Sequence, residues 1–225
     1  MNSNDVFQQV LKSLGAEKPS YIFVYGEAGS GKTNLATWIS STAIALGYKV
    51  FYLSSEGELF IDRILNFCEH MENQCMLDML HSSIVMDFYD QAQELLHLYS
   101  RVSRSENDRV LVVIDSINGL FREIAEREEA LRVLAYQSSI LRALTSLGIT
   151  TIATGQVRAY EENEIDASGA KYISWWATHI YRLQRLEGGL REMLLLKPCC
   201  MRKLLEIHSD KLVIVDGEVS DDQLA

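Results

Sequence analysis

The chain has 225 residues, a formal net charge of −10 and four cysteines. This length fits one domain and can bury a large core without disulfides. The acidic charge argues against indiscriminate coating of nucleic acid, but a local basic surface is compatible with it. No apolar run approaches the ~20 residues of a membrane span, and the first residues lack the pattern of a signal segment. We therefore expect a cytoplasmic protein.

The first two thirds of the chain alternate short apolar runs with segments of helical spacing. We expect strands at residues 21–25, 49–53, 83–87, 110–115 and 149–154. We expect helices at residues 34–45, 61–69, 91–102 and 129–147, after a short helical segment within residues 1–19. Nearly continuous apolar strands separated by helices indicate a largely parallel sheet that helices flank on both faces.

The last third of the chain changes to short strands in close succession. They lie at residues 180–185, 191–197, 204–208 and 212–215. The pair Gly188-Gly189 separates the first two, and residues 209–211 separate the last two, as in hairpins. We therefore expect antiparallel strands within residues 178–217 that extend the parallel sheet at its edge, in a single domain over residues 1–225.

A glycine-rich loop follows the first predicted strand and precedes a helix. It reads G-x-x-x-x-G-K-T and consists of Gly26, Glu27, Ala28, Gly29, Ser30, Gly31, Lys32 and Thr33. Strand, glycine loop and helix in this order form the context of a phosphate-binding P-loop. Its backbone N–H groups favour an anion, Lys32 would reach the outer phosphates, and the Thr33 hydroxyl would bind Mg²⁺. We expect ATP and Mg²⁺ as cofactors.

Polar residues stand at the carboxyl ends of three predicted strands. Asp115 ends the most apolar strand, Glu56 follows residues 49–53, and Gln156 follows residues 149–154. In a parallel sheet the ligand crevice lies at this edge. There Asp115 would hold the water shell of Mg²⁺, Glu56 would deprotonate the attacking water, and Gln156 would donate to the γ-phosphate. The alternative for Asp115 is a cap of the following turn.

These motifs resemble the RecA-type recombinase core, and most closely its archaeal RadA/RadB branch, over about residues 10–217. The matching strings are GEAGSGKTNL from Gly26, YLSSEG at residues 52–57, DRI at residues 62–64, VVIDS at residues 112–116 and TGQV at residues 154–157. The resemblance implies a RecA-like P-loop NTPase in which Lys32, Glu56 and Gln156 are catalytic. It also implies that Asn34 joins the nucleotide-binding loop and that Arg63 stacks on adenine.

The chain also departs from the family pattern. Only about twenty residues precede the first strand, so we expect the core without an N-terminal helix-hairpin-helix domain. The nearest string to the polymerisation motif Phe-x-x-Ala is FQQV at residues 7–10, and we interpret Phe7 as a packing residue. The acidic Asp-Ser-Pro of the family's intersubunit ATP cap is replaced by Leu196-Lys197-Pro198. We therefore expect slow turnover and a monomer or small oligomer rather than a long filament.

Two loops would contact DNA in such a fold. The first covers about residues 118–128, and the second, about residues 158–174, contains four acidic residues. A segment at residues 181–203 carries six basic and two acidic residues, as either a phosphate-contacting face or an ordinary solvated pair of strands. The candidate DNA-binding residues are Arg122, Arg158, Lys171 and Arg182.

Aromatic residues near the second loop have two interpretations. Tyr160, Tyr172 and Trp175 could stack on bases. Alternatively, Trp175 and Trp176 pack into the core where the next strand begins, and we favour this for Trp176.

The cysteines Cys68, Cys75, Cys199 and Cys200 lack the spacing of a zinc site. Reduced, structural thiols are the simplest expectation in a reducing compartment. A redox switch at the adjacent pair Cys199-Cys200 is the alternative.

The leading functional prediction is an ATPase that assists homologous recombination and DNA repair. It would bind single-stranded DNA, the main recombinase or another paralogue. A KaiC-type nucleotide switch that regulates a protein partner without DNA is the alternative, and a structural paralogue that only binds ATP is the third reading.

Overall fold

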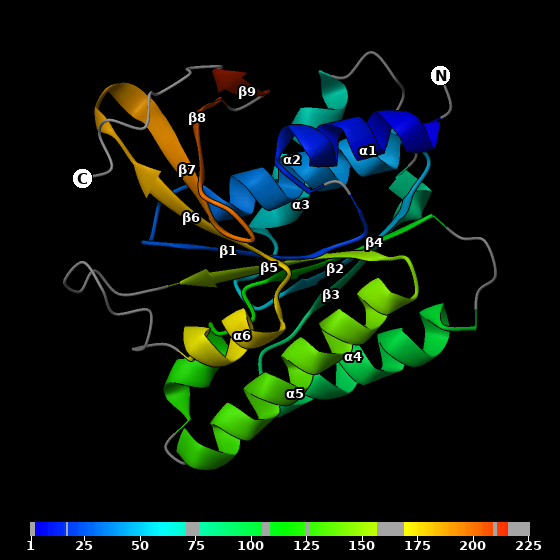
Figure 1. Ribbon diagram of the computed structural model, residues 1–225. Coiled ribbons are helices and arrows are strands. Elements are labelled where there is room, and N and C mark those ends of the chain that lie inside the picture. Colours follow the sequence, from blue (N-terminus) through cyan, green and yellow to red (C-terminus); the bar gives the residue numbers. More distant parts are fainter. Residues whose placement is uncertain are drawn as a thin grey trace.

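The computed structural model describes residues 3–16, 18–70, 77–104, 109–124, 127–156, 169–208 and 211–215. In this part of the chain, a single sheet of nine strands has the order β3-β2-β4-β5-β1-β6-β7-β8-β9 (Figure 1). The strands are β1 (Tyr21–Gly26), β2 (Lys49–Ser54), β3 (Leu80–Ile84), β4 (Val110–Asp115), β5 (Thr150–Gln156), β6 (His179–Arg185), β7 (Leu190–Lys197), β8 (Met201–Ile207) and β9 (Leu212–Val215).

Helices cover both faces of the parallel part of the sheet. In Figure 1, α1, α2 and α3 lie on one face, and α4, α5 and α6 lie on the other. The helices are α1 (Ser3–Ser13), α2 (Lys32–Ala45), α3 (Leu59–Glu69), α4 (Phe88–Val102), α5 (Arg127–Ser146) and α6 (Ala170–Trp176), and short 3-10 turns are η1 (Leu77–Met79), η2 (Leu120–Glu123) and η4 (Glu187–Gly189).

The sheet combines two kinds of pairing. Strands β3, β2, β4, β5, β1 and β6 pair in parallel, and β6 to β9 continue the sheet as an antiparallel meander. A largely parallel, helix-flanked sheet with C-terminal antiparallel strands is the predicted fold class, and it is confirmed. The parallel strands all end at one edge, at the left in Figure 1, and this edge gathers the predicted catalytic residues.

The core has two halves because the central strands are buried on both faces. Along β1, Ile22 and Val24 join the cluster under α1, α2 and α3. The alternate residues Tyr21, Phe23 and Tyr25 join the cluster under α4, α5 and α6. Side chains on a strand alternate between faces, so an unbroken apolar run supplies both halves at once.

Helix α4 and strand β8 each begin three residues earlier than predicted, and two further elements differ from the structure. The strand predicted at residues 83–87 lies three residues earlier, at Leu80–Ile84, because Asp87 caps the N-terminus of α4 instead. Its Oδ1 accepts from the N–H groups of Tyr89, at 2.7 Å, and Asp90, at 3.1 Å. Helix α6 lies where the sequence predicts a loop and the start of a strand. The run of bulky residues there fits a short helix as well as a strand.

The cysteines also differ from prediction. Cys68, at the end of α3, is disulfide-bonded, so the expectation of reduced thiols was wrong there. Cys199 and Cys200 are free and exposed. Cys75 lies outside the described residues. Cysteine spacing alone does not encode pairing, which is why the sequence could not predict this.

Helix α1 is fastened to the sheet at its C-terminal end. The Tyr181 hydroxyl of β6 donates a hydrogen bond to the buried Leu14 carbonyl just after the helix. Burial raises the pKa of Tyr181 well above its usual range, so the hydroxyl keeps its proton as a donor. Phe7 of α1 is buried against Tyr48, which agrees with its interpretation as a packing residue.

We predict that Tyr181→Phe lowers the free energy of unfolding by about 1–2 kcal/mol, because the Leu14 carbonyl loses its buried donor. Urea unfolding followed by circular dichroism measures the change. Tyr136→Phe, at an exposed tyrosine of α5, is the matched control and should change it by less than about 0.5 kcal/mol. Equal stability of both variants would contradict the prediction.

Candidate functional site

The glycine loop lies between the end of β1 and the start of α2. Gly29 and Gly31 have φ angles of 76° and 102°, which an L-residue adopts only with strain. At Gly26 the reason for glycine is space, since a Cβ atom would lie 2.1 Å from the Leu183 carbonyl oxygen of β6. The loop therefore takes its shape from two backbone conformations and one close contact with the neighbouring strand.

Lys32 folds back into the loop it follows. Its buried ammonium donates to the carbonyls of Gly26, at 3.0 Å, and Glu27, at 2.7 Å, and to Ser30 Oγ at 3.3 Å. A cation held inside a ring of backbone amides at a helix N-terminus suits a phosphate group. The loop therefore fits the phosphates of a nucleotide, and Thr33 and Asn34 follow in the first turn of α2.

Asp115 is buried at the end of β4, with hydrogen bonds from both neighbouring strands. Its Oδ2 accepts from the Tyr52 hydroxyl of β2 at 2.9 Å, and its Oδ1 accepts from Thr154 Oγ1 of β5. Burial raises the pKa of Tyr52 first, and the charge and hydrogen bond of Asp115 raise it further, so Tyr52 remains a donor. Each carboxylate oxygen keeps a second lone pair, which fits a hydrated Mg²⁺.

The Glu56 turn is bonded to itself and to the exit of β4. Ser54 Oγ accepts from the Glu56 N–H at 3.2 Å and donates to the Gly57 carbonyl at 2.8 Å. Ser55 Oγ accepts from the Ser116 N–H and donates to the Ser116 carbonyl, both at 3.0 Å. Glu56 itself is exposed, at the same edge of the sheet as Asp115. Its carboxylate is therefore open to water while its backbone is fixed.

Gln156 is held beside the P-loop by Asn118. The register of β1 and β5 pairs Gly26 with Gln156. The buried Asn118 side chain accepts from the Gln156 N–H at 3.0 Å and donates to the Gln156 carbonyl at 3.2 Å. Asn118, in the first loop after Asp115, thus holds the backbone of Gln156, where the second loop begins.

Arg63 lies in α3, the helix that follows the Glu56 turn. Its positive charge and the negative charge of Glu56 both act on the buried Tyr52 hydroxyl, one lowering and one raising the pKa. The structure therefore gathers Lys32, Glu56, Arg63, Asp115 and Gln156 around the ends of β1, β2, β4 and β5.

The described DNA-binding candidates do not form one cluster. Arg158 lies outside the described residues, as does Tyr160, and the Arg122 side chain is also not among those described. Lys171 is exposed on α6. Arg182 is only partly exposed in β6, and its Nε is buried without a hydrogen-bond partner in the described part of the chain. Its charge lowers the pKa of Tyr25, which burial raises.

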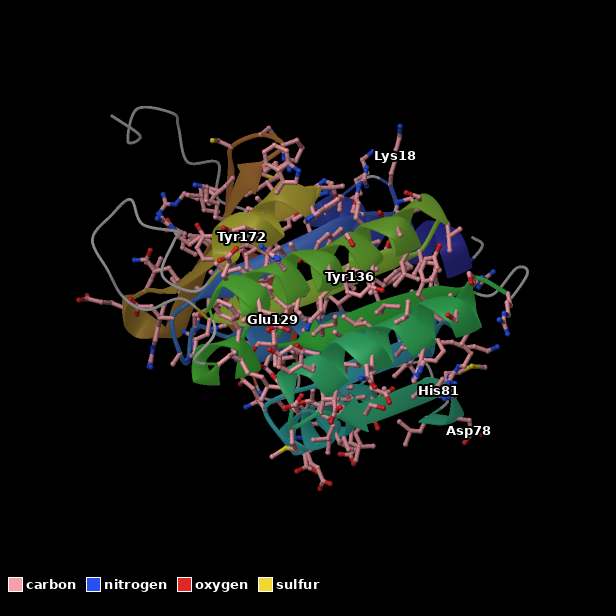
Figure 2. The ribbon with its side chains drawn as sticks, turned by 90° about the horizontal axis from the view of Figure 1, so that it is seen from below. Lys18, Asp78, His81, Glu129, Tyr136 and Tyr172 are labelled. Atoms are coloured by element: carbon pink, nitrogen blue, oxygen red, sulfur yellow. The ribbon has the colours of Figure 1, made fainter. Side chains whose placement is uncertain are left out.

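Helix α6 presents aromatic side chains to solvent. Tyr172, Trp175 and Trp176 are 43, 81 and 36% exposed, at positions i, i+3 and i+4 on the helix. We call these three residues the aromatic surface. The favoured prediction that Trp176 packs into the core was wrong, because Ala170 and Ile173 fill that role. Figure 2 shows Tyr172 on the same face of the molecule as Tyr136 of α5.

Four residues that the sequence reading did not assign hold the site together. They are Tyr52, Ser55, Asn118 and Thr154. The available signal was a polar atom within or just after an otherwise apolar buried strand. Buried polar groups need partners, so such residues mark places where neighbouring strands are bonded through side chains.

None of the described helices combines the length and apolar composition that a membrane crossing requires. In the same residues, no group of three or more His, Cys, Asp or Glu side chains could hold a metal ion.

Known proteins resemble this chain over most of its length. Residues 2–151 match the family model described as Novel STAND NTPase 3. The "DNA repair and recombination protein RadB" of Methanococcus maripaludis strain C5 is 30% identical over 76% of this chain and 79% of its own length. The proteins of that name from Methanocaldococcus jannaschii and Halobacterium salinarum are each 28% identical, over 77% and 93% of this chain and 82% and 86% of their own lengths. A P-loop NTPase core is the common feature.

Lys197, the middle residue of the segment Leu196-Lys197-Pro198, has a structural role here. Its ammonium donates to the carbonyls of Ala177, at 2.6 Å, and Ser174, at 3.3 Å. These groups lie at the C-terminal end of α6, where a cation also complements the helix dipole. Lys197 therefore fixes the helix that carries the aromatic surface.

We predict that Lys197→Met lowers the free energy of unfolding by about 1–3 kcal/mol, because two hydrogen bonds from a charged donor are lost. The tryptophan emission should also change, since Trp175 and Trp176 lie on the released helix. Equilibrium unfolding with fluorescence detection measures both. Lys18→Met, at an exposed lysine before β1, is the control and should leave both unchanged.

Proposed function

The chain belongs to the RadB-like branch of the RecA/RadA family, and we propose that it is an ATP-binding, slowly hydrolysing recombinase paralogue in homologous recombination and DNA repair. The observation that carries the proposal is that side-chain hydrogen bonds fix the residues at three strand ends beside the P-loop. Asp115, the Glu56 turn and Gln156 are each fixed by side-chain hydrogen bonds. The names of the relatives support the cellular role.

The roles of the residues follow from positioning, since phosphoryl transfer needs little covalent help from protein. Lys32 binds the outer phosphates, and Thr33 and Asp115 hold the metal and its water shell. Bound Mg²⁺ supplies charge neutralisation on the phosphates. Glu56 is open to solvent and accepts the proton of the attacking water, and Arg63 lies on the adenine side. Gln156 detects the γ-phosphate beside Gly26.

Slow hydrolysis is part of the proposal because the family's acidic intersubunit residue is absent from its place. Leu196 stands there, and the next residue, Lys197, donates hydrogen bonds to the end of α6. The active site therefore has the residues for water activation without that contribution from a neighbour. The same substitution supports a monomer or small oligomer rather than a long filament.

Single-stranded DNA is the proposed nucleic-acid ligand, and the aromatic surface is the observation that favours it. Exposed aromatic rings offer stacking faces that accept any base. The surface adjoins Lys171 and follows the second loop directly in the chain. The four acidic residues of that loop limit phosphate binding, so stacking must contribute a large share.

The main recombinase or another paralogue is the proposed protein partner. Strand β3 lies at the edge of the described sheet and pairs only with β2 there. Beside it a hollow of about 450 Å³ is lined by residues of β2, β3 and α4. An open strand with an adjacent hollow suits a partner that adds an extended segment.

A nucleotide switch of the KaiC type, without DNA, is the second candidate function. The acidic second loop favours it, because such a loop repels a phosphate backbone. The aromatic surface would then contact the regulated protein.

We predict that Glu56→Gln keeps Mg-ATP binding but lowers ATP turnover by roughly 10²-fold or more, because the amide cannot take the proton of the attacking water. Filter binding and phosphate release measure the two quantities. Glu58→Gln, two residues along in the same exposed segment, is the matched control and should retain turnover. A variant at Glu56 with normal turnover would remove this residue from the mechanism.

We predict that Trp175→Ala weakens binding of a labelled single-stranded oligonucleotide by roughly fivefold to hundredfold, because one stacking partner is lost. Fluorescence anisotropy over a salt series measures the affinity, and Tyr136→Ala on α5 is the control. If the unmodified protein binds no oligonucleotide at low salt, the DNA-binding part of the proposal fails. Binding to the recombinase, by calorimetry, then decides between a recombination role and the switch.

A further inference from the structure

The antiparallel extension of the sheet touches the P-loop directly. A Cβ atom on Gly31 would lie 2.6 Å from Ile207 Cδ1 of β8, 3.6 Å from Arg191 Nε of β7 and 3.8 Å from Leu183 Cδ2 of β6. Gly31 is the residue before Lys32 and begins the turn into α2. The guanidinium of Arg191 is therefore a close neighbour of the phosphate-binding loop.

Arg191 is anchored through one of its nitrogens only, as far as the described residues show. Its Nη1 donates to the carbonyls of Gly189, at 2.7 Å, and Leu190, at 3.1 Å. Its Nε is buried and has no hydrogen-bond partner in the described part of the chain. A buried charged donor without an acceptor is costly, so the Nε–H group beside Gly31 favours an anionic acceptor.

A second arginine stands next to the first. Arg185, at the end of β6, is the register partner of Arg191. Burial lowers the pKa of Arg191, and the charge of Arg185 lowers it further. The carboxylate of Glu192, the residue next to Arg191, is bonded to Arg202 at 2.5 Å. Two like charges in register repel each other, and an anion between or beside them would relieve the repulsion.

We propose that Arg191, supported by Arg185, is a further nucleotide-binding residue of this same chain, whose guanidinium contacts the phosphate chain of a nucleoside di- or triphosphate in the P-loop. The inference rests on the proposed function, since it needs a nucleotide in that loop. It adds a cation from β7 to the one that Lys32 supplies. Part of the ligand's charge is then neutralised without a second subunit.

The position of Arg191 favours a nucleotide over a nucleic-acid phosphate. Beside Gly31, the neighbours of Arg191 are Leu183 and Ile207, and both belong to the core half under α1, α2 and α3. The aromatic surface lies with α5 on the opposite face of the sheet (Figure 1). A strand stacked on α6 therefore lies across the sheet from the P-loop side on which Arg191 stands.

The test is a titration of fluorescent N-methylanthraniloyl ATP and ADP into the full chain without DNA. Arg191→Gln should weaken both ligands by roughly tenfold or more, because a charged hydrogen bond is lost. Arg132→Gln removes the same charge from an exposed site on α5 and is the matched control, with unchanged affinity expected. The Tm without nucleotide should be similar in both, while the Tm increase on adding nucleotide should shrink only for Arg191→Gln.

The outcomes separate the inference from the proposed function. If the unmodified chain binds neither nucleotide, the proposed function fails. If it binds both and Arg191→Gln binds them equally well, the inference alone is wrong. Loss of oligonucleotide binding with intact nucleotide binding would likewise overturn it. If Arg191→Gln is unstable, Arg191→Lys replaces it in the test, because lysine keeps the charge and changes the side chain less. A loss of severalfold is expected, and affinity equal to the unmodified chain would overturn the inference.

Discussion

The buried carboxylate of Asp115 is the constraint on which the candidate site depends. Burying a carboxylate at the end of a strand costs free energy unless hydrogen-bond donors surround it. Here the donors come from both neighbouring strands. Tyr52 and Thr154 can reach Asp115 only in the observed register of β2, β4 and β5. That register in turn brings Ser55 to Ser116 and keeps the Glu56 turn beside the Asp115 carboxylate. A shift of one residue would reverse the faces and break all of these bonds together.

The antiparallel extension of the sheet packs against the P-loop and is not only an addition at the edge. The Leu183 carbonyl excludes any side chain at Gly26, and the Ile207 side chain packs closely against Gly31. The C-terminal strands therefore restrict the P-loop from the side opposite β5, on which Gln156 lies. The P-loop is recognised from eight consecutive residues. Its shape nevertheless depends on residues far along the chain.

The sequence predicted the parts of the fold and site that are local in the chain. The P-loop, the apolar strand before Asp115 and the polar residues after each strand are short motifs, and strand order places them at one edge without further information. The Tyr52, Thr154 and Asn118 contacts could not be predicted, because each depends on which strands are neighbours. The shift of β3 has a similar cause, since Asp87 suits a helix cap as well as a strand end. The exposure of Trp176 depends on which face of α6 packs against α5, and its bulk alone misled the prediction.

Strand β7 joins the two surfaces that the proposed function requires. Arg191 near its start lies against Gly31 of the P-loop, and Lys197 at its end binds the last carbonyls of α6. Strand β7 pairs with β6 on one side and β8 on the other, so its two ends are held in a fixed relation to each other. A second connection runs from Gln156 through Asn118 to the loop after Asp115. The P-loop and the helix that carries the aromatic surface are therefore connected through β7 within one chain.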